Sequence, residues 1–100
     1  MTKEKNYRDN ILPPGSLLPL EPVMGAGRIE RFGAIKYEPE GWKDGYSVED
    51  HLIKCISHSQ EYMDGIRSDH ESFESPLYHA LCRLMYAIWL MENGEVNGRI

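Results

Sequence analysis

The chain has 100 residues and a formal net charge of −5, with 16 acidic and 11 basic side chains. This is the length of one domain, and a chain this short buries only a modest core, so association would add useful burial. The acidic balance argues against a general DNA or RNA binder, which needs a basic face. It leaves open a nucleotide site, which needs only a few local donors or a metal ion.

The cysteines and the apolar runs indicate the cellular compartment in which we expect the protein. Cys55 and Cys82 sit inside apolar helical patterns without a CxxC motif, which favours buried thiols in a reducing compartment such as the cytoplasm. Residues 1–10 are charged and lack the apolar segment of a signal peptide. The apolar run 77–91 is short for a bilayer and carries a histidine and an arginine, so we expect a buried helix and no membrane span.

The pattern along the chain predicts a single all-α domain of about three main helices. Residues 1–10 are polar and expected to be flexible, residues 11–94 form the helical domain, and residues 95–100 form a C-terminal tail. A first helix should begin near Pro22, because proline is tolerated in a first helical turn, and run towards Tyr37.

A loop with a proline and two glycines follows this helix over residues 38–46 and contains Trp42. A tryptophan in a loop either plugs the edge of a core or forms the wall of a pocket. Core burial is the commoner use, and the sequence leaves both interpretations open.

The second helix has a readable start and end. Ser47 with Asp50 three residues later resembles a capping box, and Gly65 suits the residue that follows a helix. At about 100° per residue, the apolar side chains gather on one side, with His51 and His58 at its border. The residues on this side, which we expect to face the core, are Val48, Leu52, Cys55, Ile56, Ser59, Tyr62 and Met63.

The third helix is apolar nearly all round. Ser75 can cap it, Pro76 is its first residue, and Asn93 with Gly94 closes it. A helix of this kind is buried on most sides, and one small three-helix domain can hardly surround it. We therefore expect a homo-oligomer that self-associates through the helix at residues 76–92.

This third helix carries one polar stripe. His79, Arg83 and Tyr86 are spaced at i, i+4 and i+7, so they share a face. Polar groups on a buried helix need partners. Arg83 either pairs with an acid across an interface, as part of a structural network, or faces a phosphate from the wall of a site.

Two histidines on the second helix are candidates for chemistry. His51 and His58 lie two turns apart, about 10 Å along the helix axis, so they cannot readily share one metal ion. His58 and Glu61, at i and i+3, could hold a metal ion with a third ligand. A lone histidine at an apolar border is more often a satisfied core-edge residue, but three histidines on two inward helices favour a site.

The connection between the second and third helices is acidic. Asp69, Glu71 and Glu74 crowd residues 66–75, where a charge run is usually a solvated loop. Such carboxylates are also the hard oxygen ligands that Mg²⁺ and Mn²⁺ prefer. The ExxE…ExxD pattern of all-α nucleotide pyrophosphohydrolases is not present, so a metal site here would use an atypical ligand set.

Taken in order, these segments resemble the dATP/dGTP diphosphohydrolase-like family carried by many phages. The matching pieces are FGAIKY at 32–37 with Trp42, HLIKCISH at 51–58, GIRSDHES at 65–72 and HA at 79–80. The resemblance implies a MazG-like, all-α nucleotide pyrophosphohydrolase relative that acts on purine deoxynucleoside triphosphates with a divalent metal. The functional set that it implies by position is Lys36, Tyr37, Trp42, His51, His58, Asp69, Glu71 and His79.

The chain also departs from the family pattern. Pro76 stands where the family has a further histidine, Arg83 stands where a small or amide residue is usual, and Ser57 and Phe73 replace a basic residue and a glycine. The loss of the histidine counts against hydrolysis more than against binding, and Arg83 adds a donor suited to phosphate. This combination would suit a protein that holds a nucleotide without cutting it.

The first functional hypothesis is an enzyme that cleaves a purine dNTP to the monophosphate and pyrophosphate. Asp69 and Glu71, together with Glu61, would hold Mg²⁺ or Mn²⁺, and His58 or His79 would orient or deprotonate a water. The remaining roles would be the phosphate clamp, formed by Lys36 and Arg83, and stacking on the base by Trp42 or Tyr37.

Two further hypotheses do not require catalysis. The same pocket could sequester a nucleotide or a cyclic nucleotide without a metal, as a phage anti-defence sponge in the cytoplasm of an infected bacterial host. A third possibility is a phage assembly protein that uses the helix at residues 76–92 as an adhesive face. None of the three involves a nucleic acid polymer or a membrane.

Overall fold

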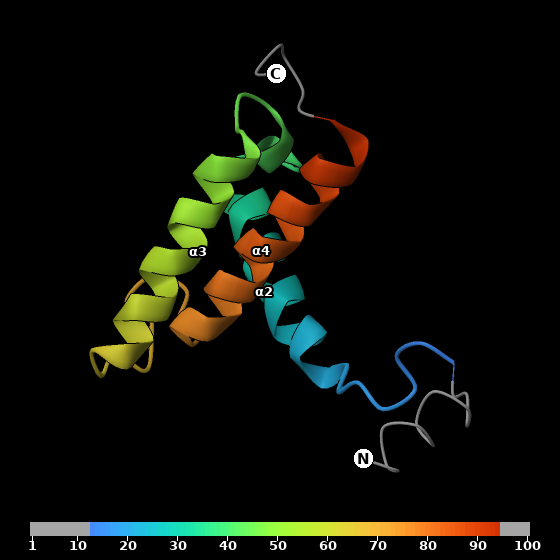
Figure 1. Cartoon of the computed structure of the whole chain (residues 1–100). Helices are drawn as coiled ribbons and strands as arrows, with labels where there is room; N and C mark the ends of the chain where they lie inside the picture. The colour runs from blue at the N-terminus through green and yellow to red at the C-terminus, as the bar shows by residue number, and fades with distance from the viewer. Residues whose placement is uncertain (1–12, 95–100) are drawn as a thin grey trace.

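The computed structural model describes residues 13–94 as an all-helical arrangement without strands (Figure 1). Its elements are α2 (Glu21–Lys36), the short 3₁₀ helix η1 (Gly41–Lys43), α3 (Val48–Met63) and α4 (Pro76–Asn93). The sequence predictions for residues 1–10 and 95–100 lie outside the described residues. Within residues 13–94, no helix has the length and hydropathy needed to cross a membrane.

The helix ends form where the local sequence predicts them. Ser47 Oγ accepts a hydrogen bond from the Asp50 amide at 3.0 Å, and the Asp50 carboxylate accepts one from the Ser47 amide at 2.8 Å. Ser75 Oγ likewise accepts from the amide of Leu77 at the start of α4. Gly65 and Gly94 follow α3 and α4 with positive φ angles of 101° and 85°, which glycine adopts without strain. The three main helices and their caps are therefore confirmed.

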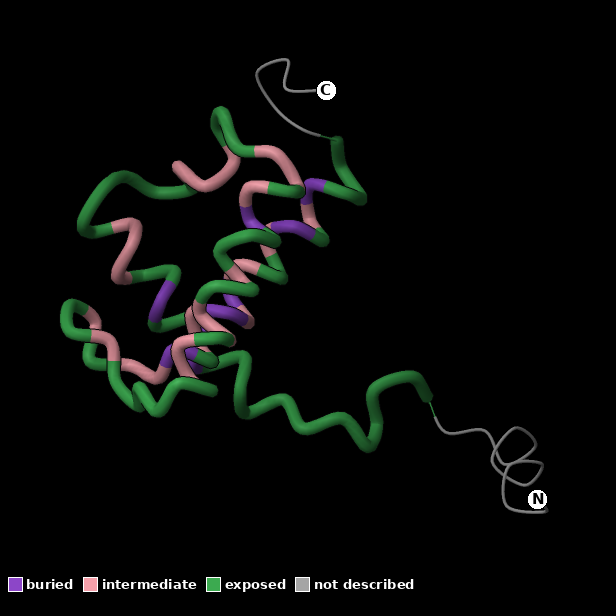
Figure 2. Tube along the Cα trace, turned by 60° about the vertical axis from the view of Figure 1, so that its left-hand side comes forward, coloured by how far each residue is buried: buried purple, intermediate pink, exposed green. Residues whose placement is uncertain are grey.

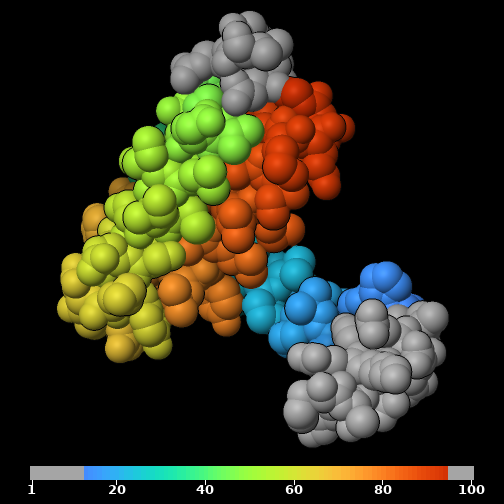
Figure 3. Space-filling model, viewed as in Figure 1, coloured from blue at the N-terminus to red at the C-terminus, as the bar shows by residue number. Residues whose placement is uncertain are grey.

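α4 is the centre of the molecule. It packs against α3 along its length and against α2 in a second, smaller contact, and Figure 3 shows α3 and α4 side by side on one face. Figure 2 shows most of the buried positions on α4. These are Pro76, Ala80, Cys82, Ala87 and Leu90, to which α2 adds Gly25, Ala26 and Ile29. The small core therefore lies on both sides of one helix.

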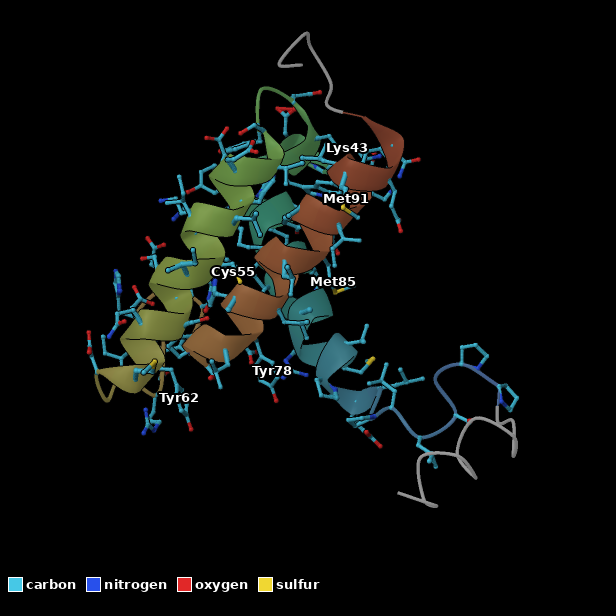
Figure 4. The ribbon with its side chains drawn as sticks, in the orientation of Figure 1. Lys43, Cys55, Tyr62, Tyr78, Met85 and Met91 are labelled. Carbon is cyan, nitrogen blue, oxygen red and sulfur yellow. The ribbon has the colours of Figure 1, made fainter. Side chains whose placement is uncertain are left out.

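The side of α3 that faces inward differs from the one expected from its apolar pattern. His51 is the buried residue of α3, and Cys55 is partly covered, while Ile56 and Met63 are 68% and 78% exposed. Figure 4 shows Cys55 between α3 and α4. The prediction failed because α4 presents polar as well as apolar groups to α3. The helix therefore turns its histidines towards α4, where His51 meets the Arg83 guanidinium and the His58 ring lies against that of His79.

The described chain does not cover the outer side of α4. Leu84 and Ile88, one turn apart, are 38% and 41% exposed, and Figure 4 shows Met85 and Met91 on the side turned away from α3. A helix that is apolar on most sides thus stays partly open to solvent in the single chain.

The contact between α2 and α4 depends on a glycine. A Cβ atom at Gly25 would overlap the ring of Tyr78, while a Cβ atom at Gly27 would meet nothing within 4 Å. Arg28 adds an ion pair to Glu74, with Nε and Oε2 2.8 Å apart, and its guanidinium lies over the Tyr78 ring. Gly25 therefore lets the Tyr78 ring lie directly on the α2 backbone.

We expect Gly25→Ala to destabilise the protein by about 1–3 kcal/mol, because the added methyl forces the Tyr78 ring out of its position. Gly27→Ala is the matched control, and it should leave the free energy of unfolding unchanged or raise it by up to about 1 kcal/mol through helix propensity. Urea unfolding of both variants measures the difference. Equal stability of the two would contradict this account of the α2–α4 contact.

Candidate functional site

The candidate residues gather around one cavity of about 600 Å³ between α2, η1, α3, α4 and the loop before α4. Of the ten side chains singled out from the sequence, nine line the cavity and one, His51, does not. The nine are Lys36, Tyr37, Trp42, His58, Glu61, Asp69, Glu71, His79 and Arg83. The three residues of the polar stripe of α4 all line the cavity, since Tyr86 lies in its wall beside His79 and Arg83.

Two histidines face each other at one end of the cavity. The rings of His58 and His79 have centroids 4.8 Å apart, His58 Nδ1 lies 3.0 Å from Glu61 Oε1, and His79 Nε2 lies 2.7 Å from Ser72 Oγ. Burial lowers the pKa of His79, and the neighbouring His58 lowers it further. His79 is therefore neutral at pH 7, the state in which an imidazole can accept a proton.

The loop between α3 and α4 is held by Asp69. Its Oδ2 accepts hydrogen bonds from the amides of Glu71 and Ser72 at 2.9 and 2.8 Å, and its own amide donates to the Glu74 carbonyl. Burial raises the pKa of Asp69, but the two amides and the nearby His79 outweigh it, so the net shift is downward. The first role of this carboxylate is thus to fix the loop beneath His79.

The three carboxylates predicted as metal ligands have separate partners. Asp69 accepts from loop amides, Glu71 Oε1 lies 2.6 Å from Lys36 Nζ, and Glu61 pairs with His58. Across residues 13–94, no group of three His, Cys, Asp or Glu side chains is placed to hold a metal ion. As arranged here, these carboxylates do not fit a shared divalent cation.

Lys36, the last residue of α2, and Tyr37 after it both line the cavity. The Lys36 ammonium is paired with Glu71 and lies 5.2 Å from the centre of the Tyr37 ring. Tyr37 is 75% exposed, although it borders the cavity. Its ring is therefore available to a ligand, beside a cationic group.

Trp42 both plugs the core edge and forms cavity wall. One face of its ring stacks on Tyr86, with centroids 4.2 Å apart and planes 3° apart, and its edge meets Trp89. The Lys43 ammonium lies 5.4 Å from the ring centre. Of the two aromatic residues expected to stack on a base, Tyr37 is the more accessible.

Arg83 lies in the cavity wall beside a buried histidine. Its Nη1 is 3.1 Å from His51 Nδ1, and among the described residues it forms no ion pair with a carboxylate. His51 is fully buried, and its Nε2 lies 2.9 Å from the Trp42 carbonyl oxygen. His51 was expected to contact the ligand, but the structure places it behind Arg83.

Three lining or supporting residues were not singled out from the sequence. Ser72 hydrogen-bonds His79, Lys54 adds a cation to the lining, and the Tyr46 ring lies 6.0 Å from the Arg83 guanidinium. Ser72 belongs to the GIRSDHES segment, so that pattern could have found it. Lys54 is not among the side chains that the apolar pattern placed inward, and it was missed because that pattern misplaced the inward face of α3.

A protein-family profile described as "dATP/dGTP diphosphohydrolase, N-terminal" matches residues 2–99. The chain belongs to this dATP/dGTP diphosphohydrolase family. The match covers nearly the whole sequence and includes every residue that lines the cavity. Searches of curated proteins and of solved structures returned no match.

The buried histidines should make the stability of this family member depend on pH. Burial lowers the pKa of both His51 and His79 from the ordinary value of 6.5, so the unfolded chain takes up protons first as the pH falls. The free energy of unfolding is highest above pH 6.5, where both histidines are neutral in the folded and the unfolded chain. It declines as the pH falls from 6.5 through the lowered pKa values. Urea unfolding over this range should therefore show decreasing stability.

The slope of this decrease identifies the responsible groups. His79→Gln should make it shallower, whereas the exposed His70→Gln, as the matched control, should leave it as in the wild type. An unchanged slope in His79→Gln would remove His79 from this explanation.

Proposed function

We propose that the cavity binds a purine nucleotide, with the base on Tyr37 and the phosphates at Arg83 and Lys36. The observation that carries this proposal is the convergence of nine side chains singled out from the sequence, seven of them from the family pattern, on one cavity. An arginine fork and a lysine match phosphate oxygens, and an exposed aromatic ring offers a stacking surface. Family membership supports dATP or dGTP as the nucleotide.

We further propose that the bound dNTP is cleaved to the monophosphate and pyrophosphate. A water would attack phosphorus, the bond between the α-phosphorus and the bridging oxygen would break, and pyrophosphate would leave. Neutral His79 is suited to accept the proton of that water, with Ser72 orienting its ring. Because the carboxylates do not fit a shared divalent cation, no step is assigned to a metal.

A second candidate is sequestration of an intact nucleotide or cyclic nucleotide, as an anti-defence protein in a phage-infected bacterial cell. The charge of the lining favours it, because seven carboxylates face the cavity beside only three lysine or arginine side chains. A cyclic nucleotide carries one negative charge per phosphate, whereas a triphosphate carries up to four. The acidic lining therefore opposes a cyclic ligand less than a triphosphate.

Nucleotide binding is tested by thermal unfolding with a panel of mono-, tri- and cyclic purine nucleotides, each with Mn²⁺ and with EDTA. A ligand at a hundredfold its Kd stabilises the folded state by about 2.7 kcal/mol, which gives a visible rise in Tm. Arg83→Ala should weaken binding by on the order of 2–5 kcal/mol if it leaves a buried phosphate charge unpaired. If no nucleotide raises the Tm under either condition, the proposed function is wrong.

The same incubations separate cleavage from sequestration when products and bound ligand are both analysed. Release of pyrophosphate, lost in His79→Gln, would favour the hydrolase, because His79 is the proposed acceptor of the water proton. Recovery of intact ligand, with equal affinity with Mn²⁺ and with EDTA, would favour sequestration. His70→Asn is the matched control, because His70 is exposed and does not line the cavity.

We also propose that a second copy of the chain covers α4. Leu84 and Ile88 lie on one face of this helix and stay partly exposed in the single chain, and closed homo-oligomers are the usual way to bury such a face.

Leu84→Glu or Ile88→Glu should therefore lower the oligomeric state or unfold the protein. Leu17→Glu, at a 79% exposed position before α2, is the control for an added charge. Sedimentation measures the outcome. A wild-type chain that is monomeric at micromolar concentration would contradict self-association.

A further inference from the structure

The hydrogen bonds of His51 fix its protonation. The Trp42 carbonyl oxygen can only accept, so His51 Nε2, at 2.9 Å, must carry the proton that it donates. The Arg83 guanidinium can only donate, so His51 Nδ1, at 3.1 Å from Nη1, must be unprotonated and accept. The two partners therefore require the same state, a neutral imidazole with its proton on Nε2.

The surroundings leave the His51 ring no alternative arrangement. Its side chain is fully buried, and the ring is enclosed by Tyr46 at 5.0 Å and Tyr86 at 5.3 Å between centroids. A ring turned over in this site would set Cε1–H against the carbonyl oxygen and Cδ2–H against the guanidinium, so both hydrogen bonds would be lost. The other tautomer would set an unprotonated nitrogen against the carbonyl oxygen and a ring N–H against the guanidinium. The ring orientation is thus determined from both sides.

We propose that His51 is a positioning residue that holds the Arg83 guanidinium at the cavity wall and joins it to the Trp42 loop. The guanidinium has five N–H groups, and within residues 13–94 its one hydrogen bond is that to His51, so it can still donate to a ligand. Because no carboxylate of the described chain pairs with Arg83, His51 is the neutral acceptor that sets its direction without cancelling its charge.

This role explains why a fully buried side chain belongs to the HLIKCISH segment without touching the cavity. The proposed role of His51 rests on the proposed function in one respect, the identity of the ligand as a nucleotide phosphate. The geometry of His51 and Arg83 can be tested without any ligand.

Two substitutions separate the two hydrogen bonds. The amide of an asparagine lies near the position of Nδ1, so His51→Asn keeps an acceptor for Arg83 and loses the donor to Trp42. The amide of a glutamine lies near the position of Nε2, so His51→Gln keeps the donor to Trp42 and loses the acceptor at Nδ1. Stability and ligand binding should therefore respond differently to the two variants.

The first experiment measures nucleotide affinity by calorimetry for the wild type, both His51 variants and Arg83→Ala. We expect His51→Gln to weaken binding about ten- to a hundredfold, the loss that corresponds to one hydrogen bond to a charged group. His51→Asn should recover most of that affinity although its Tm is lowered. In the Arg83→Ala background, His51→Gln should cause no further loss of affinity.

A merely structural His51 gives the opposite pattern. Affinity would then follow stability in both variants, and His51→Gln would weaken binding equally with and without Arg83. Either result would overturn the proposal.

The second experiment needs no nucleotide. Nitrogen NMR of the histidine rings in the free protein should show His51 as the neutral form with its proton on Nε2, and Arg83→Ala should shift its Nδ1 signal. A proton on Nδ1, or an Nδ1 signal indifferent to Arg83→Ala, would overturn the proposal. Absence of nucleotide binding by the wild type, with the expected NMR result, would reject the proposed function and leave the geometry of His51 and Arg83 established.

Discussion

The contact between α3 and α4 includes paired polar side chains, and the rest of the structure is arranged around it. His51 and His58 of α3 meet Arg83 and His79 of α4, where apolar packing alone would allow neighbouring registers. Within the described chain, every buried side-chain nitrogen and oxygen has a hydrogen-bond partner. A shift by one residue would leave several of them unpaired, at about 1–3 kcal/mol each.

This contact also anchors the two loops that complete the cavity. α3 and α4 run in opposite directions (Figure 1), so His51 and His79 lie towards opposite ends of the pair. His51 holds the Trp42 carbonyl in the loop before α3, and His79 holds Ser72 in the loop before α4. The cavity lies between two loops whose positions are both set by imidazole hydrogen bonds. A change in either histidine would therefore alter the shape of the cavity as well as its chemistry.

The sequence predicted the helices better than the faces that they bury. Helix ends depend on interactions within four residues, so the capping box at Ser47 and the glycine at 94 could be read directly. The inward side of α3 depends on α4, which is distant in sequence and offers Arg83 and His79 as partners. A hydrophobicity pattern assigns no benefit to such pairs, so it placed Ile56 inside and the histidines at the border.

In the candidate site, too, local features could be predicted from the sequence, whereas contacts between distant residues could not. The polar stripe of α4 was predictable, because its residues are related by helical geometry alone. The partners of the carboxylates were not, because Glu71 meets Lys36 across 35 residues and Asp69 turns back on its own loop. The sequence therefore predicted which residue types gather, but not which of them neutralise one another before a ligand arrives.

That internal neutralisation makes the two side chains that are proposed to bind phosphate unequal. A ligand phosphate would have to displace Glu71 from Lys36, but this ion pair has side chains 35% and 50% exposed, and pairs at such positions contribute only about 0–1 kcal/mol. Arg83 has no such competitor in the described chain, and its neutral partner His51 leaves its full charge facing the cavity. In the proposed complex, the released Glu71 stays beside the phosphates and opposes additional negative charge. In that proposed complex, Arg83 would account for most of the phosphate attraction, and Lys36 with Glu71 would limit how much negative charge a ligand can bring.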